Sequence, residues 1–315
     1  MFNFIISAFQ QQIKAKENLS SSTIKINDLP NEVLNLIFLH LPANELCRSV
    51  SLTCKKWKNI LDSVSFWTEK LLLDSKANLE LIKYLNLNGC YEPKKLYIKN
   101  PYAKNLIKNP CGDQNFDHWC LKPNFFFQQN SNYEINDENG CLDVIKLGNL
   151  EQINIFKSGN SESNGFLIES DNNGSQPIYD NENKLIKKFA TTHFMGSKYQ
   201  IIDLEKEGVD RNVLKKLKPK IEIIDYYAGR HDCDSEYHIR VGLFDDNFKI
   251  IYSIAFDHLI SQLNNGKWHR FYQVLENYPD NLRYILFHHG GKDTQYWSGY
   301  YGVKITNSTV KFNLN

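Results

Sequence analysis

The 315-residue sequence contains no run of about 18 consecutive apolar residues, which is the length that a membrane-spanning helix needs. It also has no excess of one charge, because Lys and Arg total 37, Asp and Glu total 36, and the formal net charge is +1. A nucleic-acid binder or a polybasic membrane anchor would show a strong basic excess. We therefore expect no nucleic-acid partner and no membrane span.

Cysteine lacks any regular spacing. None of the 7 cysteines forms a C-x-x-C pair, so the pattern does not favour a structural zinc site. The amino-terminal segment Met1–Phe9 is apolar, but it lacks the basic residues with which a signal peptide begins. We expect residues 1–23 to form a flexible segment, the thiols to be reduced, and the protein to be cytoplasmic.

Catalytic motifs are missing as well. The sequence has no P-loop, no HExxH and no GxSxG pattern. His231, Asp232 and Cys233 are adjacent, and neighbours on a tight loop rarely reach nucleophile–base geometry. The pair His288-His289 has no third ligand at metal spacing. We expect no catalytic residues, no metal and no cofactor, and hence a protein that is not an enzyme.

What the sequence does contain is two different periodicities. Over residues 24–73, apolar residues recur at spacings of three and four, as in Leu34, Ile37, Phe38 and Leu41, which predicts amphipathic helices. Pro30 suits a helix start and Pro42 ends the helix. Three short helices in about 50 residues cannot hold a large core. Part of their apolar surface is therefore expected to be buried on a partner.

A linker is expected over residues 74–108. Its apolar spacing predicts one helix up to Leu87, followed by Gly89. The basic stretch Lys94–Pro101 reads as a loop, with Leu96-Tyr97-Ile98 as a possible short packing element.

From residue 109 to 315 the period changes to two, which predicts short strands separated by turns and excludes a βαβ enzyme fold. The polar stretches Lys157–Gly165 and Asp171–Ser175 read together as a mobile insertion. The expected strands are Gln200–Leu204, Ile221–Tyr226, Tyr237–Leu243, Lys249–Phe256, Trp268–Val274, Leu282–Phe287 and Gly302–Thr306.

The helical unit resembles an F-box. Its pattern is Leu29-Pro30, a helix, Leu41-Pro42, and then Cys54-Lys-Lys-Trp57 with a later Trp67. The resemblance implies docking onto the Skp-type adaptor of an SCF-type cullin–RING ubiquitin ligase. The adaptor-binding residues that it implies are Leu29, Pro30, Ile37, Leu41, Pro42, Leu46, Val50, Cys54, Trp57 and Trp67.

The strand-rich part resembles the F-box-associated domain of the sugar-recognising F-box proteins. The resemblance implies a jelly-roll-like sandwich of about ten antiparallel strands, and an α+β multidomain chain overall. It rests on Asn109–Gly112, His118-Trp119, Tyr199–Leu204, Asp225–Asp232, Phe287–Gly291, Asp293, Tyr296-Trp297, Gly299, Tyr301-Gly302 and Thr306–Ser308.

In that family, loops at one end of the sandwich hold the core of a high-mannose N-glycan. The resemblance places Tyr296, Trp297, Ser298, Asp232 and Phe194 in this site. Aromatic side chains offer an apolar face to a sugar ring, and a carboxylate accepts hydrogen bonds from its hydroxyls. Asp234 would replace Asp232 if the loop register shifted by two, and His193 is the alternative to Phe194.

Two positions depart from the family pattern. The stretch Asn130–Glu134 lacks the usual Gly-Gly turn and Trp, and Ser298 stands where the family has Lys. The resemblance as a whole favours a ligase substrate receptor that binds the N-glycans of misfolded glycoproteins for degradation. The two departures leave open a receptor whose sandwich binds protein without sugar. An F-box that acts with the adaptor but outside a ligase is the third alternative.

Overall fold

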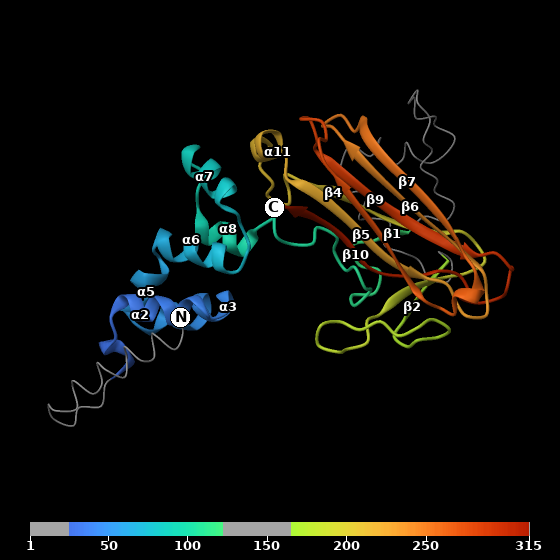
Figure 1. Cartoon of the computed structure of the whole chain (residues 1–315), viewed down its shortest axis with the longest axis horizontal. Coiled ribbons are helices and arrows are strands. Elements are labelled where there is room, and N and C mark those ends of the chain that lie inside the picture. The colour runs from blue at the N-terminus through green and yellow to red at the C-terminus, as the bar shows by residue number, and fades with distance from the viewer. Residues whose placement is uncertain (1–24, 122–164, 315) are drawn as a thin grey trace. The chain divides into compact units, whose positions relative to one another are not determined.

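The computed structural model of the chain describes residues 25–121 and 165–314 (Figure 1). It divides into a first unit that ends at Leu73 and a second unit that begins at Asp74. The expected flexible segment 1–23 and the stretch Asn130–Glu134 lie outside the described residues. Within those residues, no helix is long and apolar enough to cross a membrane.

The first unit is helical, as its periodicity predicts. Phe38 on α2 packs edge-on against Trp57 on α5, with ring centroids 5.2 Å apart. The indole N–H of the buried Trp67 donates to the carbonyl of Leu61 at 2.6 Å, which joins α6 to the end of α5. The helices are α2 (Asn31–Leu39), α3 (Ala43–Glu45), α4 (Ser51–Thr53), α5 (Lys55–Leu61) and α6 (Val64–Leu73), with a π-helical turn over Leu46–Val50.

The second unit begins with two helices, α7 (Leu79–Leu87) and α8 (Pro93–Lys99). The first was expected, but the loop expected over Lys94–Pro101 was wrong. Pro93 occupies the first helical position, where its missing N–H costs nothing, and Tyr97 is buried. Basic residues such as Lys95 lie on the exposed side of this helix. Because they dominate the composition of the stretch, its short apolar face does not stand out in the sequence.

The rest of the second unit is a β-sandwich. Within the described residues, ten strands form two antiparallel five-stranded sheets, in the orders β1-β4-β9-β6-β7 and β2-β3-β10-β5-β8 (Figure 1). The strands are β1 (Cys120–Leu121), β2 (Phe166–Glu169), β3 (Lys188–Thr191), β4 (Gly196–Asp203), β5 (Lys220–Ala228), β6 (Ser235–Phe244), β7 (Ile250–Ile260), β8 (Trp268–Leu275), β9 (Tyr284–Asp293) and β10 (Lys304–Asn313). The expected all-β sandwich of about ten strands is confirmed.

A short α-helix lies among the described strands. The helix α11 (Arg211–Leu217) connects β4 to β5, and Asp210 caps it by accepting from the N–H of Asn212 at 2.7 Å. A helix of two turns is too short to cross between parallel strands, so the exclusion of a βαβ fold stands.

The register gathers four connections at one end of the sandwich. Ser235 at the start of β6 pairs with both Ile260 and Asp293, which end β7 and β9. In the other sheet, Ala228 at the end of β5 pairs with Lys304, where β10 begins. The loops β3–β4, β5–β6, β7–β8 and β9–β10 each cross from one sheet to the other at this end. We call it the loop end.

Candidate functional site

The loop between β9 and β10 presents two aromatic side chains to solvent. The exposed fraction of Tyr296 is 75% and that of Trp297 is 41%. Both follow the end of β9 at Asp293, so they are not strand residues and neither belongs to the core. Ser298 is exposed beside them. Three of the five expected site residues therefore lie together on one exposed loop.

The carboxylate of Asp293 holds this loop in shape. Asp293 is fully buried, and its Oδ1 accepts from the backbone N–H of Gln295 at 2.9 Å and of Tyr296 at 2.6 Å. Tyr296 has a positive φ of 60°, a conformation that a non-glycine residue rarely adopts. The family resemblance includes Asp293 but gives it no role in the site, although an Asp two residues before a turn is a known side-chain-to-backbone signal.

Phe194 lies on the neighbouring β3–β4 connection and is 67% exposed. The carbonyl of Thr192 accepts from the N–H of Asp293 at 2.9 Å, and the carbonyl of Thr191 accepts from the N–H of Gly302 at 2.9 Å. These bonds join the connection to both ends of the aromatic loop. The ring of His193 packs on Phe194 with centroids 4.0 Å apart and is less exposed, so Phe194 presents the open aromatic surface.

Asp232, on the β5–β6 loop, is paired with Arg230. The guanidinium donates from Nε to Oδ1 at 2.7 Å and from Nη2 to Oδ2 at 2.8 Å. These hydrogen bonds hold the pKa of Asp232 below its usual range, so the side chain is an ionised acceptor. About a third of the side chain remains exposed, and each oxygen keeps lone-pair capacity beyond its bond to Arg230.

Asp234, the alternative to Asp232, has a different position. Its Oδ1 accepts from the N–H of Gln262 at 2.6 Å, and its backbone carbonyl accepts from the N–H of Thr294 at 3.0 Å. It thus joins the β7–β8 and β9–β10 connections to its own loop. The structure therefore gives Asp234 the role of a link between loops, whereas Asp232 is paired with Arg230 within its own loop.

Nucleophilic chemistry is disfavoured at this end. Cys233 is buried, and burial raises the pKa of its thiol to about 11, so the thiol is protonated at neutral pH. The described residues contain no group of three or more His, Cys, Asp or Glu side chains arranged to hold a metal ion. Exposed aromatic faces beside an ionised acceptor fit a ligand that has an apolar face and hydroxyl edges.

Of the expected mobile insertion, Lys157–Asn164 lies outside the described residues, whereas the segment Asp171–Ser175 after β2 is tied to the fold by hydrogen bonds. Asn173 donates from Nδ2 to Glu169 at 2.7 Å and accepts from Arg230 at both its backbone carbonyl and its Oδ1. Its neighbour Gly174 accepts from the N–H of His231 at 2.9 Å. These bonds tie the segment to the β5–β6 loop, and the polar composition reflects hydrogen bonding rather than solvation.

The residues expected to bind the adaptor divide into two groups. Leu46 and Trp67 are 0% and 1% exposed and belong to the core of the helical unit, so they can support an interface only by holding its helices. Pro30, Ile37 and Pro42 are exposed, and Leu29, Leu41, Val50, Cys54 and Trp57 are partly exposed. Leu52, which is 78% exposed, adds apolar surface that the pattern did not single out.

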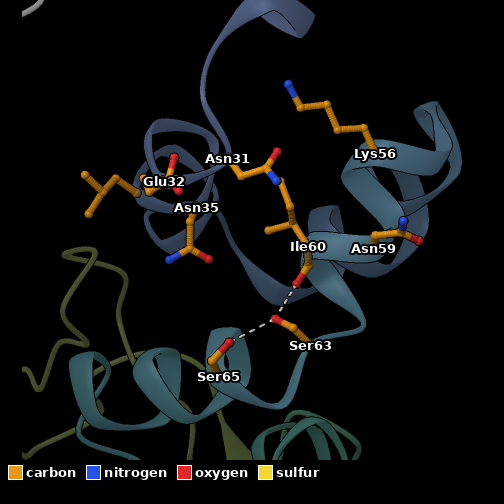
Figure 2. Close-up of a pocket in the computed structure, with 9 residues that line it drawn as sticks. Asn31, Glu32, Asn35, Lys56, Asn59, Ile60, Ser63 and Ser65 are labelled. Carbon is orange, nitrogen blue, oxygen red and sulfur yellow. Dashed lines mark hydrogen bonds between the residues drawn. The ribbon is translucent and has the colours of Figure 1, made fainter.

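A pocket of about 600 Å³ opens between α2, α5 and the start of α6 in the same unit (Figure 2). Polar side chains dominate its lining, with Leu36 and Ile60 as its apolar members. Lys56 donates from Nζ to the carbonyls of Asn27 at 2.8 Å and Leu29 at 2.7 Å, which fixes the segment leading into α2. This pocket was not foreseen, because its residues come from three helices and share no spacing.

Comparisons with known proteins agree with both resemblances. A family model described as "F-box associated region" matches residues 97–312, and one described as "F-box-like" matches residues 26–72. F-box only protein 6 of Bos taurus is 30% identical over 288 residues, which cover 91% of this chain and 92% of that protein. F-box only protein 44 of Homo sapiens is 28% identical over 286 residues, covering 90% of this chain and 95% of that protein.

A solved structure of TmCBM61 in complex with β-1,4-galactotriose covers 67% of this chain and 99% of its own chain. Its TM-score is 0.35 and its identity 10%, values too low to support an inference about ligand or fold.

Proposed function

The chain belongs to the F-box proteins that carry an F-box-associated region, and from this membership we propose that it is the substrate-recognition subunit of an SCF-type cullin–RING ubiquitin ligase. In this proposal the helical unit docks a Skp-type adaptor through its exposed residues, among them Pro30, Ile37 and Pro42. The loop end of the sandwich captures the substrate. The protein itself is non-catalytic and acts in the cytoplasm by holding the substrate near activated ubiquitin, which raises its effective concentration.

We propose that the captured group is the core of a high-mannose N-glycan on misfolded glycoproteins destined for ER-associated degradation. The observation that carries this proposal is the exposure of Trp297 and Tyr296 on a loop fixed by Asp293. Tyr301 of the same loop contacts Arg230, the partner of the ionised Asp232. A sugar ring packs its C–H face on an aromatic side chain and bonds its hydroxyls to an acceptor. A small polar interface of this kind gives an affinity on the order of micromolar to millimolar for the free glycan.

The test is capture of a glycoprotein by the full chain, before and after enzymatic removal of its N-glycans. We expect capture of the glycosylated form only, and loss of capture in Trp297→Ala. The matched control is Tyr272→Ala, because Tyr272 on β8 is 47% exposed and lies outside the loop end. Equal capture of the deglycosylated protein would refute the glycan proposal.

A second candidate is a receptor whose sandwich binds protein without sugar. Ser298 in place of the family's Lys, and the engagement of both Asp232 oxygens by Arg230, favour it. Free chitobiose competes with substrate in the first case and not in the second. An F-box acting with the adaptor alone would differ from both by failing to co-purify with a cullin.

A further inference from the structure

Arg230 is the most connected side chain at the loop end. It follows β5, is 8% exposed, and uses its guanidinium toward three different connections. Two N–H groups donate to Asp232 in its own loop, and Nη1 donates to the Asn173 carbonyl at 2.8 Å and Oδ1 at 3.0 Å in the β2–β3 connection. The third contact is with the β9–β10 loop, where the guanidinium lies over the ring of Tyr301 at 4.4 Å.

The fit around this guanidinium is close. A Cβ placed on Gly174 would lie 2.7 Å from the central guanidinium carbon, and Gly174 has a positive φ of 86°. A side chain at position 174 would have to displace the guanidinium and adopt a backbone conformation that residues other than glycine rarely adopt. The β2–β3 connection therefore packs closely against the guanidinium at this position.

Tyr301 also contacts Trp297, one of the two exposed aromatic residues of the proposed glycan site. Its ring meets the ring of Trp297 edge to face, with centroids 5.2 Å apart at 75°. Tyr301 thus lies between a buried guanidinium and the exposed indole. Arg230 itself is too buried to offer a surface to a ligand, so it can act on binding only through the groups that it holds, which are Asp232 and the ring of Tyr301.

A simple charge balance would not need this geometry. Asp232 and Glu169 both lie near Arg230, and a lysine ammonium would compensate their charge equally well. A lysine cannot donate to both oxygens of a carboxylate in a fixed plane while its cation lies over an aromatic ring, whereas the Arg230 guanidinium does both. The bidentate pair with Asp232 and the contact with the Tyr301 ring therefore indicate that Arg230 holds these two side chains in a fixed geometry.

We infer that Arg230 is a positioning residue for the glycan site, which sets the plane of the Trp297 indole through the ring of Tyr301 and is itself held by Asp232. The ligand named in this inference rests on the proposed function, whereas the contacts of Arg230 do not. It gives Asp232 a purpose besides accepting sugar hydroxyls.

The test is a double-mutant cycle measured by calorimetric titration of the full chain with chitobiose. We expect Arg230→Lys to weaken binding about tenfold, Tyr301→Leu to weaken it similarly, and Tyr301→Phe to leave it unchanged. The double variant should bind no more weakly than Tyr301→Leu alone. Additive losses in the double variant, or an undiminished affinity in Arg230→Lys, would overturn the inference.

A ligand-free readout separates this inference from the proposed function. With 5-fluorotryptophan incorporated, Arg230→Lys should shift the ¹⁹F resonance of Trp297, identified by its absence in Trp297→Phe, and leave that of the buried Trp119 in place. If the unmodified chain fails to bind chitobiose but this shift occurs, the glycan proposal fails and the positioning role stands. An unmoved Trp297 resonance in a variant with an unchanged melting temperature contradicts the positioning role.

Discussion

His289 and Asp225 face each other between the two sheets, with the imidazole Nδ1 2.6 Å from the carboxylate Oδ2 and both side chains fully buried. Because the carboxylate only accepts, the ring proton lies on Nδ1, and Nε2 accepts from Lys198. Lys198 Nζ lies 3.1 Å from the ring centroid of Trp119 and 3.9 Å from that of Phe189, and burial holds the pKa of this amine well below its usual value. This chain of polar groups joins β4 and β9 of one sheet to β5 of the other.

The buried histidines predict a loss of stability in acid. Burial lowers the pKa of His289 to about 4 and that of His238 to about 3. In the unfolded chain both rings take up a proton near pH 6.5, so unfolding is favoured as the pH falls from about 6.5 toward 4. Each histidine contributes up to about 1.4 kcal/mol per pH unit in this window.

Urea unfolding at pH 7 and pH 5 measures this effect. We expect a lower free energy of unfolding at pH 5, with a smaller difference in His289→Gln. The matched control is His118→Asn, because His118 is exposed and its positive φ of 71° suits asparagine. Equal stability of the unmodified chain at the two pH values would contradict the account.

Removing Asp225 should be far more costly than removing an exposed carboxylate. Asp225→Ala leaves the hydroxyls of Tyr237 and Ser308 and the Nδ1–H of His289 without their acceptor inside the sandwich, and we expect a loss of about 3–5 kcal/mol in the free energy of unfolding. Asp257→Ala breaks a pair with Arg240 in which the Asp side chain is 56% exposed. That change should cost less than about 1 kcal/mol, and losses of similar size in the two variants would refute the distinction.

The carboxylate of Asp293 predicts a separate effect on the aromatic loop. Asp293→Ala removes the acceptor of three backbone N–H groups, and we expect glycan affinity to fall about tenfold as the Tyr296 conformation is lost. Asp293→Asn keeps an oxygen acceptor and should retain most of the affinity. Titration with chitobiose compares them, and equal affinities for Asp293→Ala and the unmodified chain would show that the loop needs no such support.

Ser298 offers a gain-of-function test. The family that this loop resembles carries Lys after Tyr-Trp, and an ammonium can donate to sugar hydroxyls where Ser298 forms at most weaker neutral bonds. We expect Ser298→Lys to raise chitobiose affinity about threefold or more. Ser298→Met supplies the length without the charge and should not. An unchanged affinity in Ser298→Lys would place residue 298 outside the sugar contact.

The helical unit allows interface and core to be separated. Ile37 is 40% exposed and Leu46 fully buried. We expect Ile37→Glu to abolish capture of the adaptor and leave the melting temperature unchanged. Leu46→Ala should instead lower the free energy of unfolding by about 2–5 kcal/mol. Retained adaptor capture by Ile37→Glu would exclude this helix face from the interface.

The periodicities predicted the fold well because alternation and helical spacing report directly on burial. The strand over 221–226 and the helix ending at Leu87 lie within elements that the structure contains. The helix Pro93–Lys99 was not predicted because its apolar face is short and its lysines dominate the composition. The strand β1, with two residues, is too short to show any period.

At the site, the sequence indicated which residues lie on the loops but not how they are held. Tyr296 and Trp297 stand out as adjacent aromatics, whereas the roles of Asp293 and Arg230 depend on contacts with loops far away in the chain. Asn173 and Tyr301 both touch Arg230, yet they are 128 positions apart in the numbering. Such contacts leave no local pattern, so only the folded arrangement identifies them.

The most direct measurement is calorimetric titration of the full chain with chitobiose, together with its Trp297→Ala and Tyr272→Ala variants. The account predicts saturable binding in the unmodified chain and in Tyr272→Ala, and none in Trp297→Ala. Absence of saturable binding at millimolar chitobiose in the folded, unmodified chain would contradict the glycan proposal. Binding that survives Trp297→Ala would contradict the assignment of the site to the loop end.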